Sequence, residues 1–323
     1  MAEGSPTQGP RILAIRGGAI GDFVLTLPAL AALHRAFPGC HMEILGYKHI
    51  AELGLHGGPV AGATYARGVR CIEYGALAAF FARGFDLDPE LCRYFASFDR
   101  VVSWLFDPDK VFETNLERAG AKNFLCAYTP IDNARHASLQ LAAELTKLQV
   151  QIEDPVAHLF LTEAALENAR AWLAEHTGAD DQRPLIAIHP GSGSARKNWP
   201  VGHWRSLGDR AAAAGARLLI IGGEADTESL NYLEKKLEPH NPILARNLPL
   251  SLVAALLTRS VAYFGNDTGI SHIAAGVGVK CTLLFGPTGP SVWAPAGPNV
   301  TTIRAPGGNL SILPHDAVSL PQL

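Results

Sequence analysis

Short apolar runs alternate with longer segments of helical periodicity along this chain of 323 residues. Runs such as 11–16, 185–188 and 261–264 are rich in aliphatic and β-branched residues, the pattern of parallel strands that are buried on both faces. Each of these runs ends in a polar turn that contains glycine or proline. The repeated order of strand, turn and helix predicts an α/β fold built on parallel sheets.

The alternation occurs in two series, separated by the polar segment 151–155, which lacks helical periodicity and is typical of a linker. A length of 323 residues is comfortable for two domains. We therefore predict one domain at 1–154 and another at 155–323, with a cleft between them. The expected strands are 11–16, 41–45, 71–74, 101–104 and 123–126 in the first domain, and 185–188, 218–221, 243–244, 261–264 and 282–285 in the second.

Helices are expected between these strands. Pro28 lies inside the first helical segment and predicts that the regular helix starts near it or is kinked there. A helix over 134–148 closes the first domain, and a short one over 271–278 follows the strand 261–264. The other expected helices are 77–82, 89–96, 110–118, 163–175, 201–214, 227–237 and 251–258.

Charge and cysteine content narrow the classes of function. The net charge of −3 and the pI near 6.5 argue against a nucleic-acid partner held by neutralising phosphates. No window approaches the roughly 20 apolar residues of a membrane span, and the start of the chain lacks the apolar stretch of a signal peptide. We expect a cytoplasmic protein, for which peripheral contact with a membrane surface stays open.

The scattered cysteines show no metal-binding spacing and predict buried, reduced thiols: Cys40, Cys71, Cys92, Cys126 and Cys281.

The polar turn after the strand 261–264 carries Asp267, Thr268, Gly269 and His272. The helix that follows would direct free backbone N–H groups toward a ligand above this turn, the usual way to hold a phosphate. A structural interpretation also fits, in which Asp267 or Thr268 caps the helix and His272 is satisfied in the core. Polar turns recur at the carboxyl ends of the strands, where doubly wound sheets bind ligands, and this favours a binding site.

A second cluster, 189–200, follows the strand 185–188. Its glycines and serines, Ser192 among them, expose N–H and hydroxyl donors, while Arg196 and Lys197 add positive charge ahead of a helix. This is the composition of an anion cradle. Such loops are also common without function, and Trp199 would then serve only as an anchor. The position of this loop on the same sheet edge as Asp267 favours anion binding.

A glycine-containing loop, 17–22, follows the first strand and matches the dinucleotide-binding fingerprint poorly. The first glycine of that fingerprint would fall at Arg16, and no acid follows the second strand. We interpret Gly18 and Gly21 as permitting close approach of the backbone to a ligand, with tight packing as the alternative. The triplets 86–88 and 107–109 read Asp-x-Asp, which binds a divalent metal in one class of sugar-transferring enzymes. Here we expect them to be solvated loop acids.

Several motifs follow one another in a defined order along the chain. They are Gly21-Asp22 with Leu27-Pro28-Ala29-Leu30 behind it, the HPGS…KxWP loop at 189–200, GGExD at 222–226, NDTGxxH at 266–272 and FGPT at 285–288. This ordered set resembles glycosyltransferase family 9, whose best-known members are the ADP-heptose:lipopolysaccharide heptosyltransferases. No matching motif lies between Tyr47 and His136.

The resemblance implies the GT-B architecture, with two Rossmann-like domains facing a central cleft. The first domain would bind the acceptor and the second the nucleotide-sugar donor. The implied reaction is inverting transfer of a heptose or related sugar from an ADP-sugar to a hydroxyl of a lipopolysaccharide core or other surface-glycan precursor, with neither metal nor cofactor. The alternatives are a non-catalytic nucleotide-sugar-binding protein and, less favoured, an NAD-dependent oxidoreductase.

Carried over by motif, Asp22 is the implied general base, which takes the proton of the acceptor hydroxyl. The same residue also fits a helix cap. Lys197, with the hydroxyl of Ser192, would neutralise charge that builds on the departing diphosphate. The other implied donor contacts are Asp267 with sugar hydroxyls, Thr268 and Gly269 with phosphate, the neighbouring His272, Glu228 with ribose and Leu248 with adenine.

The acceptor side of the resemblance rests on fewer residues. Arg16, Gly18 and Gly21 form the implied acceptor-side loop, and Ala19 stands where family members often carry serine. A phosphorylated acceptor would favour basic residues nearby. The first domain has roughly as many acids as bases, and the candidates that could gather there are Arg16, Lys48, Arg67 and Arg70.

Overall fold

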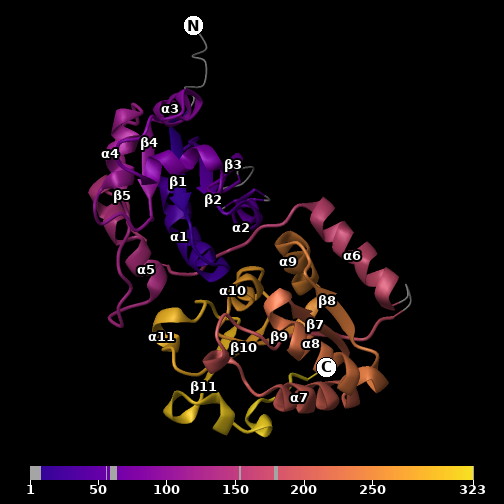
Figure 1. Cartoon of the computed structure of the whole chain (residues 1–323). Helices are drawn as coiled ribbons and strands as arrows, with labels where there is room; N and C mark the ends of the chain where they lie inside the picture. The colour runs from indigo at the N-terminus through magenta and orange to yellow at the C-terminus, as the bar shows by residue number, and fades with distance from the viewer. Residues whose placement is uncertain (1–8, 56, 59–63, 153, 178–180, 323) are drawn as a thin grey trace, which may run out of the picture. The chain divides into compact units, whose positions relative to one another are not determined.

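Figure 1 shows a computed structural model of the chain, which describes residues 9–55, 57–58, 64–152, 154–177 and 181–322. The described residues form two compact units. The first holds the residues up to Ala19 together with Thr26–Asp132 and Ala137–Pro155, and the second holds Ile20–Leu25, Asn133–His136 and the rest of the chain from Val156. The long helix α1, Ile20–Ala36, therefore contributes its first turns to the second unit.

The first unit is built on a parallel sheet of five strands in the order β3-β2-β1-β4-β5 (Figure 1). Aromatic side chains of the segments between strands, such as Phe80, Phe95 and Phe112, pack on one face of it and form a buried core with Leu13 and Ile15. The strands are β1 Arg11–Arg16, β2 His41–Gly46, β3 Gly68–Cys71, β4 Arg100–Ser103 and β5 Phe124–Cys126; the other α-helices are α2 Lys48–Ala51, α3 Pro89–Ala96, α4 Val111–Arg118 and α5 Ala137–Leu141.

The second unit is built on a parallel sheet of six strands in the order β11-β10-β9-β6-β7-β8. Two parallel α/β sheets confirm the predicted fold class. The strands are β6 Leu185–His189, β7 Arg217–Gly222, β8 Ile243–Arg246, β9 Ser260–Asn266, β10 Cys281–Phe285 and β11 Val300–Arg304; the helices are α6 Glu163–Thr177, α7 Val201–Ala213, α8 Thr227–Leu237, α9 Leu250–Thr258, α10 Gly269–Gly276 and α11 Pro290–Trp293.

Pro28 does not mark the start of α1, because the helix begins at Ile20 and continues through the proline. A proline inside a helix costs about 3 kcal/mol through its lost N–H and its steric clash. Phe23, Val24 and Leu27, on the preceding turns, are almost completely buried. Burial of such side chains contributes about 1.5–3 kcal/mol each, which outweighs the proline penalty.

Other differences from the expected elements have local causes. The strand β11 was not predicted, because its side chains are half-buried or exposed at the edge of the sheet and form no buried apolar run. The helix expected over 134–148 is instead α5 followed by a short 3-10 helix at Ala143–Leu148. The five cysteines are free, as expected, but only Cys40 and Cys281 are buried, and Cys126 is exposed. Within the described ranges, no helix is long and apolar enough to cross a membrane.

Candidate active site

Three loops of the second unit meet at the carboxylate of Asp267, which follows β9 and is 8% exposed. Lys197, from the loop after β6, donates from Nζ to Oδ2 of Asp267 at 2.8 Å. Thr288, from the loop after β10, donates its hydroxyl to the same oxygen at 2.6 Å. Because β10, β9 and β6 are neighbours in a parallel sheet, their carboxyl ends lie at one edge. Lys197 and Asp267 therefore lie at one sheet edge, as predicted, and they form an ion pair in which Thr288 also takes part.

Asn266, the last residue of β9, fixes the loop that carries Lys197. Its side chain is fully buried and donates from Nδ2 to the carbonyl oxygens of Pro190, at 2.9 Å, and Gly191, at 3.3 Å. Its Oδ1 accepts from the backbone N–H of Trp199 at 3.2 Å. The indole of Trp199 is buried and donates to the carbonyl of Leu313 at 2.9 Å, so it does anchor the loop.

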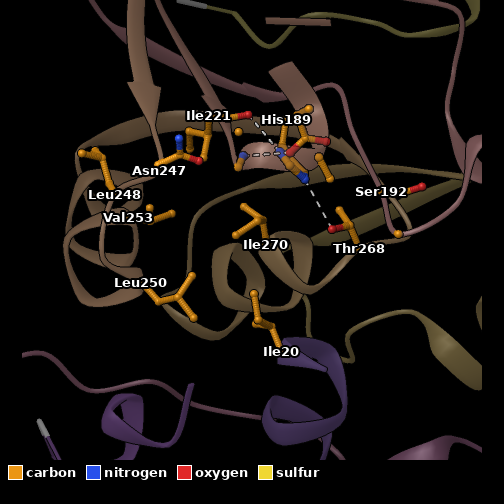
Figure 2. A pocket seen from close by; sticks show the side chains of 15 residues that line it. Ile20, His189, Ser192, Ile221, Asn247, Leu248, Leu250, Val253, Thr268 and Ile270 are labelled. Carbon is orange, nitrogen blue, oxygen red and sulfur yellow. Dashed lines mark hydrogen bonds between the residues drawn. The ribbon is translucent and has the colours of Figure 1, made fainter. Parts of the chain in front are cut away.

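A cavity of about 250 Å³ opens beside this cluster (Figure 2). One part of its wall is apolar, and another part is polar and includes Ser192 and Thr268, two of the predicted donor contacts. Leu248, the predicted adenine contact, lies on the apolar part, whereas Glu228 is exposed on the first turn of α8 and is not part of the lining. The apolar lining comprises Ile20, Ile221, Leu248, Leu250, Val253 and Ile270, and the polar side chains are His189, Ser192, Asp226, Asn247 and Thr268.

His189, at the end of β6, is a site residue to which the sequence analysis assigned no role. Its ring is buried, and Nδ1–H donates to the carbonyl of Ile221 at 2.9 Å (Figure 2). This tautomer leaves Nε2 as an acceptor for the hydroxyl of Thr268 at 3.4 Å. Burial lowers the pKa of His189, an effect that the charge of Asp226 opposes, so the ring is neutral at neutral pH. The sequence signal that could have identified His189 as a site residue is its position directly after the apolar run 185–188.

Gly191 is required by the close packing of its loop on the turn 222–226. A Cβ atom at this position would lie 1.6 Å from Oδ1 of Asp226. The other oxygen of Asp226, Oδ2, accepts from the backbone N–H of Gly223 at 2.9 Å. The carboxylate of Asp226 is thus fixed within its own turn and packs directly on the backbone of Gly191.

The helix α10 begins at Gly269, two residues earlier than predicted. Thr268 occupies its N-cap position, but its side chain makes no capping hydrogen bond, so the capping interpretation of Thr268 is wrong. Asp267 is engaged by Lys197 and Thr288. A Cβ atom on Gly269 would lie 2.5 Å from Cβ of Ile20, which explains the glycine. The N–H of Ser271 donates to the carbonyl of Thr268 at 3.1 Å, whereas the N–H groups of Gly269 and Ile270 have no partner within the helix and are suited to an anion.

His272, on α10, is 5% exposed, and its pKa is lowered to about 4, chiefly by burial. The negative charges of Asp267 and Asp22 oppose this shift, whereas His136 and Lys197 favour it. Asp22 lies in the first turn of α1, which belongs to the second unit. A Cβ atom on neighbouring Gly21 would lie 3.2 Å from Cδ2 of His272. The pKa of His272 therefore responds to the charges of Asp22, Lys197 and Asp267, which places all three near its ring.

The four basic residues considered for the acceptor do not all lie at one edge of the sheet. Arg16 is paired with Gly46 at the carboxyl end of β1, whereas the backbone N–H of Arg67 donates to Met42 near the opposite edge of the sheet. Lys48 pairs with Glu52, and Arg70 with Glu90. Gly18, in the acceptor-side loop, has φ of +103°, a conformation that favours glycine.

One acid of each Asp-x-Asp triplet binds a helix end, whereas the other, Asp86 or Asp109, is exposed as expected of a loop acid. Asp88 caps α3 by accepting from the N–H of Leu91 at 2.9 Å. Asp107 accepts from the N–H groups of Val111 and Glu113 at the start of α4, both at 2.9 Å. Across the described residues, no three His, Cys, Asp or Glu side chains form a group that could hold a metal ion.

Residues 134–312 match the family model described as glycosyltransferase family 9 (heptosyltransferase), which covers more than half of the chain. The chain belongs to glycosyltransferase family 9. This family 9 enzyme is 28% identical over 298 residues to lipopolysaccharide heptosyltransferase 1 of Pseudomonas aeruginosa, covering 87% of the chain and 79% of the relative. It is 24% identical over 321 residues to lipooligosaccharide heptosyltransferase 2 of Haemophilus influenzae, covering 93% and 90%.

Solved structures agree with the fold of this family 9 enzyme. The ADP-heptose lipopolysaccharide heptosyltransferase II of E. coli superimposes with a TM-score of 0.74 at 17% identity, covering 95% of each chain. A family 9 glycosyltransferase of Veillonella parvula gives a TM-score of 0.73 at 20% identity, covering 92% of this chain and 86% of the other. The predicted fold, two doubly wound parallel-sheet domains of the kind found in GT-B enzymes, is therefore confirmed.

Proposed function

We propose that this glycosyltransferase transfers a heptose from ADP-heptose to a hydroxyl of a lipopolysaccharide core, with inversion at the anomeric carbon. The observation that carries the proposal is the cluster of Lys197, Asp267 and Thr288 beside the cavity that contains Leu248. The names of the relatives support the sugar and the acceptor. A similar E. coli heptosyltransferase, with a TM-score of 0.69 at 20% identity, was solved with ADP, which supports the nucleotide.

The donor fits the cavity by its chemistry. The flat, apolar faces of adenine suit the wall around Leu248, and the diphosphate suits the polar wall around Ser192 and Thr268. The N-terminus of α10 and the ammonium of Lys197 would stabilise the negative charge of the diphosphate. Asp267 keeps Oδ1 available for sugar hydroxyls, because both Lys197 and Thr288 contact Oδ2.

Asp22 is the proposed general base. As the acceptor oxygen forms its bond to the anomeric carbon, its proton passes to the carboxylate of Asp22, and the bond to the diphosphate breaks on the opposite face. Lys197 and the helix terminus would stabilise the departing ADP. A general base typically contributes about 10²- to 10⁴-fold in rate.

We further propose that transfer needs neither metal nor cofactor, because Lys197 and backbone N–H groups can supply the charge that a metal would provide. The glycosyltransferase TibC of E. coli is described as iron-containing and superimposes with a TM-score of 0.53 at 15% identity. Metal dependence therefore needs a direct test. Turnover should persist in excess EDTA. Activity that disappears in EDTA and returns with one divalent metal would contradict this proposal.

The proposed setting is the cytoplasmic face of a membrane, where the protein would meet its glycolipid acceptor without spanning the bilayer. Cosedimentation with vesicles that carry the acceptor tests this. Binding that requires the acceptor lipid agrees with the proposal, whereas no binding at any acceptor content contradicts it.

The donor and the reaction are tested together. Calorimetry with ADP, UDP and GDP should show tightest binding of ADP, and incubation with ADP-heptose and a lipopolysaccharide core acceptor should release ADP. NMR of the product should show an inverted anomeric configuration. Tight ADP binding without turnover on any core acceptor would instead favour the alternative, a nucleotide-sugar-binding protein.

A further inference from the structure

The amino-terminal edge of the first sheet carries a row of basic residues. His41, Arg11 and Arg100 are the first residues of β2, β1 and β4, and Arg67 immediately precedes β3. These four strands are neighbours in the order β3-β2-β1-β4, and Arg11 is directly opposite His41 in the register. The acceptor-side loop follows the other end of β1, so this row belongs to a different edge of the sheet.

A cavity of about 400 Å³ lies at this row. The charged or titratable side chains of its lining are Arg11, His41, Glu43 and Arg67. The remaining lining residues, Gly9 and Gly39, bring backbone without side chains to the wall. Two guanidinium groups and an imidazole thus surround a space that contains a single carboxylate.

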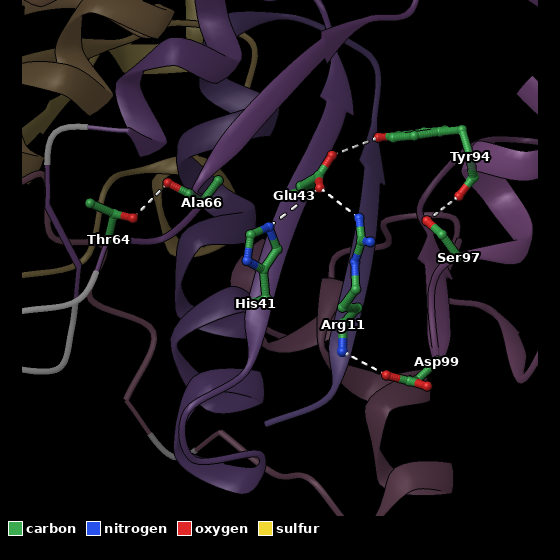
Figure 3. Close-up of polar contacts among 8 residues, drawn as sticks. All are labelled: Arg11, His41, Glu43, Thr64, Ala66, Tyr94, Ser97 and Asp99. Carbon is green, nitrogen blue, oxygen red and sulfur yellow. Dashed lines mark hydrogen bonds and ion pairs between the residues drawn. The ribbon is translucent and has the colours of Figure 1, made fainter. Parts of the chain in front are cut away.

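That carboxylate is already occupied by its neighbours (Figure 3). Oε1 of Glu43 accepts from Nη2 of Arg11 at 3.1 Å and lies 3.4 Å from Nε2 of His41. Oε2 accepts from the hydroxyl of Tyr94 at 3.2 Å. Burial raises the pKa of Tyr94, so the phenol keeps the proton that it donates. Glu43 therefore orients Arg11 and His41 rather than providing a free acceptor for a cation.

Some side-chain N–H groups of Arg11 and Arg67 have no partner among the described residues. Arg67 forms no ion pair within the part of the chain that the structure describes. Nε of Arg11 is buried and has no hydrogen-bond partner there. Its guanidinium is held over the ring of Phe98, 4.8 Å from the centroid. This ring and Glu43 hold Arg11 in place beside the cavity, while Arg67 keeps its donors available for an anion.

We propose that this cavity binds a small oxyanion of the phosphate class, held by the guanidinium groups of Arg67 and Arg11 with His41 beside them. Guanidinium groups match the geometry and charge of phosphate oxygens. The site is separate from the donor cavity, which belongs to the second unit. The same chemistry is offered by free phosphate and by a phospholipid headgroup, and the experiment distinguishes them.

The test is calorimetric titration with inorganic phosphate in saturating ADP, which fills the donor site. The wild-type protein should bind phosphate in the millimolar range, and Arg67→Gln should bind at least about tenfold more weakly, the loss of one charge-assisted contact. Arg11→Gln, which removes the other guanidinium charge of the lining, should also weaken binding. Arg83→Gln is the matched control, because Arg83 is exposed and lies outside the cavity lining.

A second arm uses vesicles of phosphatidylglycerol and, separately, of phosphatidylcholine. Phosphate binding that depends on Arg67, without vesicle binding, assigns the site to a free anion. Binding to phosphatidylglycerol that is lost in Arg67→Gln assigns it to a headgroup. If neither probe binds, or if Arg67→Gln and Arg83→Gln behave alike with both, the site does not exist. Neither arm depends on sugar transfer, so its result is independent of the proposed function.

Discussion

The hydroxyl of Thr288 offers a sharp test of how Asp267 is held for sugar binding. Thr288→Val keeps the shape of the side chain and removes only the donor, which lies 2.6 Å from Oδ2 of Asp267. Lys197 would then hold this oxygen alone, with a side chain that is 31% exposed. We expect the carboxylate to lose its fixed orientation toward the donor sugar.

The size of the effect follows from the bond. A hydrogen bond to a charged group contributes about 1.5–3 kcal/mol, and 1.4 kcal/mol corresponds to a tenfold change in rate. Thr288 is only half-buried, so water can partly replace its hydroxyl, which favours the lower end of this range. We expect kcat/KM for ADP-heptose to fall about tenfold, while the Kd for ADP, which lacks the sugar, stays unchanged.

The assay follows ADP release at varied ADP-heptose with the acceptor saturating. Thr282→Val is the control, because Thr282 is a half-buried residue of β10 that forms no side-chain hydrogen bond within the described chain. Turnover by Thr288→Val within twofold of Thr282→Val would refute the orienting role. An equal loss in ADP affinity would show that the variant disturbs the nucleotide site instead.

Further predictions concern the loop, the turn and the buried imidazole. Lys197→Ala should both weaken ADP binding and slow transfer, and unchanged kinetics would dismiss its role with phosphate. Gly191→Ala should weaken ADP binding by displacing Asp226, whereas Gly202→Ala, outside the cavity lining and with nothing within 4 Å of its added Cβ, should not; equal affinities would contradict the packing argument. Because the pKa of His272 falls from 6.5 to about 4 on folding, the unfolded state binds more protons between these values, and stability should decrease as the pH falls through this window. This loss is about 1 kcal/mol from pH 7.5 to 5.5, and a His272→Gln variant with the same pH dependence of its unfolding midpoint would contradict it.

Much of the fold was predictable because both faces of each central strand are buried. Runs such as Leu185–His189 and Cys281–Phe285 are apolar almost throughout, so their ends fall close to the predicted positions. The strand β11, with exposed side chains at the sheet edge, carries no such signal. The start of α1 was missed because the local cost of Pro28 is visible in the sequence, whereas the tertiary burial of Phe23 and Leu27 is not.

The site was predictable where motifs end at neighbouring strands. Lys197 and Asp267 meet because β6 and β9 are adjacent, and the sheet order makes that contact possible. The bonds of His189 to Ile221 and Thr268, and of Thr288 to Asp267, depend on side-chain orientations that residue spacing does not determine. The sequence also could not show that Arg16 and Arg67 lie apart. Arg16 ends β1 and Arg67 precedes β3, so the two residues lie at opposite edges of one sheet.

The carboxylate of Asp22 is the centre of the proposed chemistry, and Asp22→Asn tests it most directly. The measurement pairs the Kd for ADP, by calorimetry, with the single-turnover rate of heptose transfer. We predict an unchanged Kd and a transfer rate lower by about 10²- to 10⁴-fold, because the amide cannot accept the proton of the acceptor hydroxyl. Transfer by Asp22→Asn at the wild-type rate would contradict the mechanism.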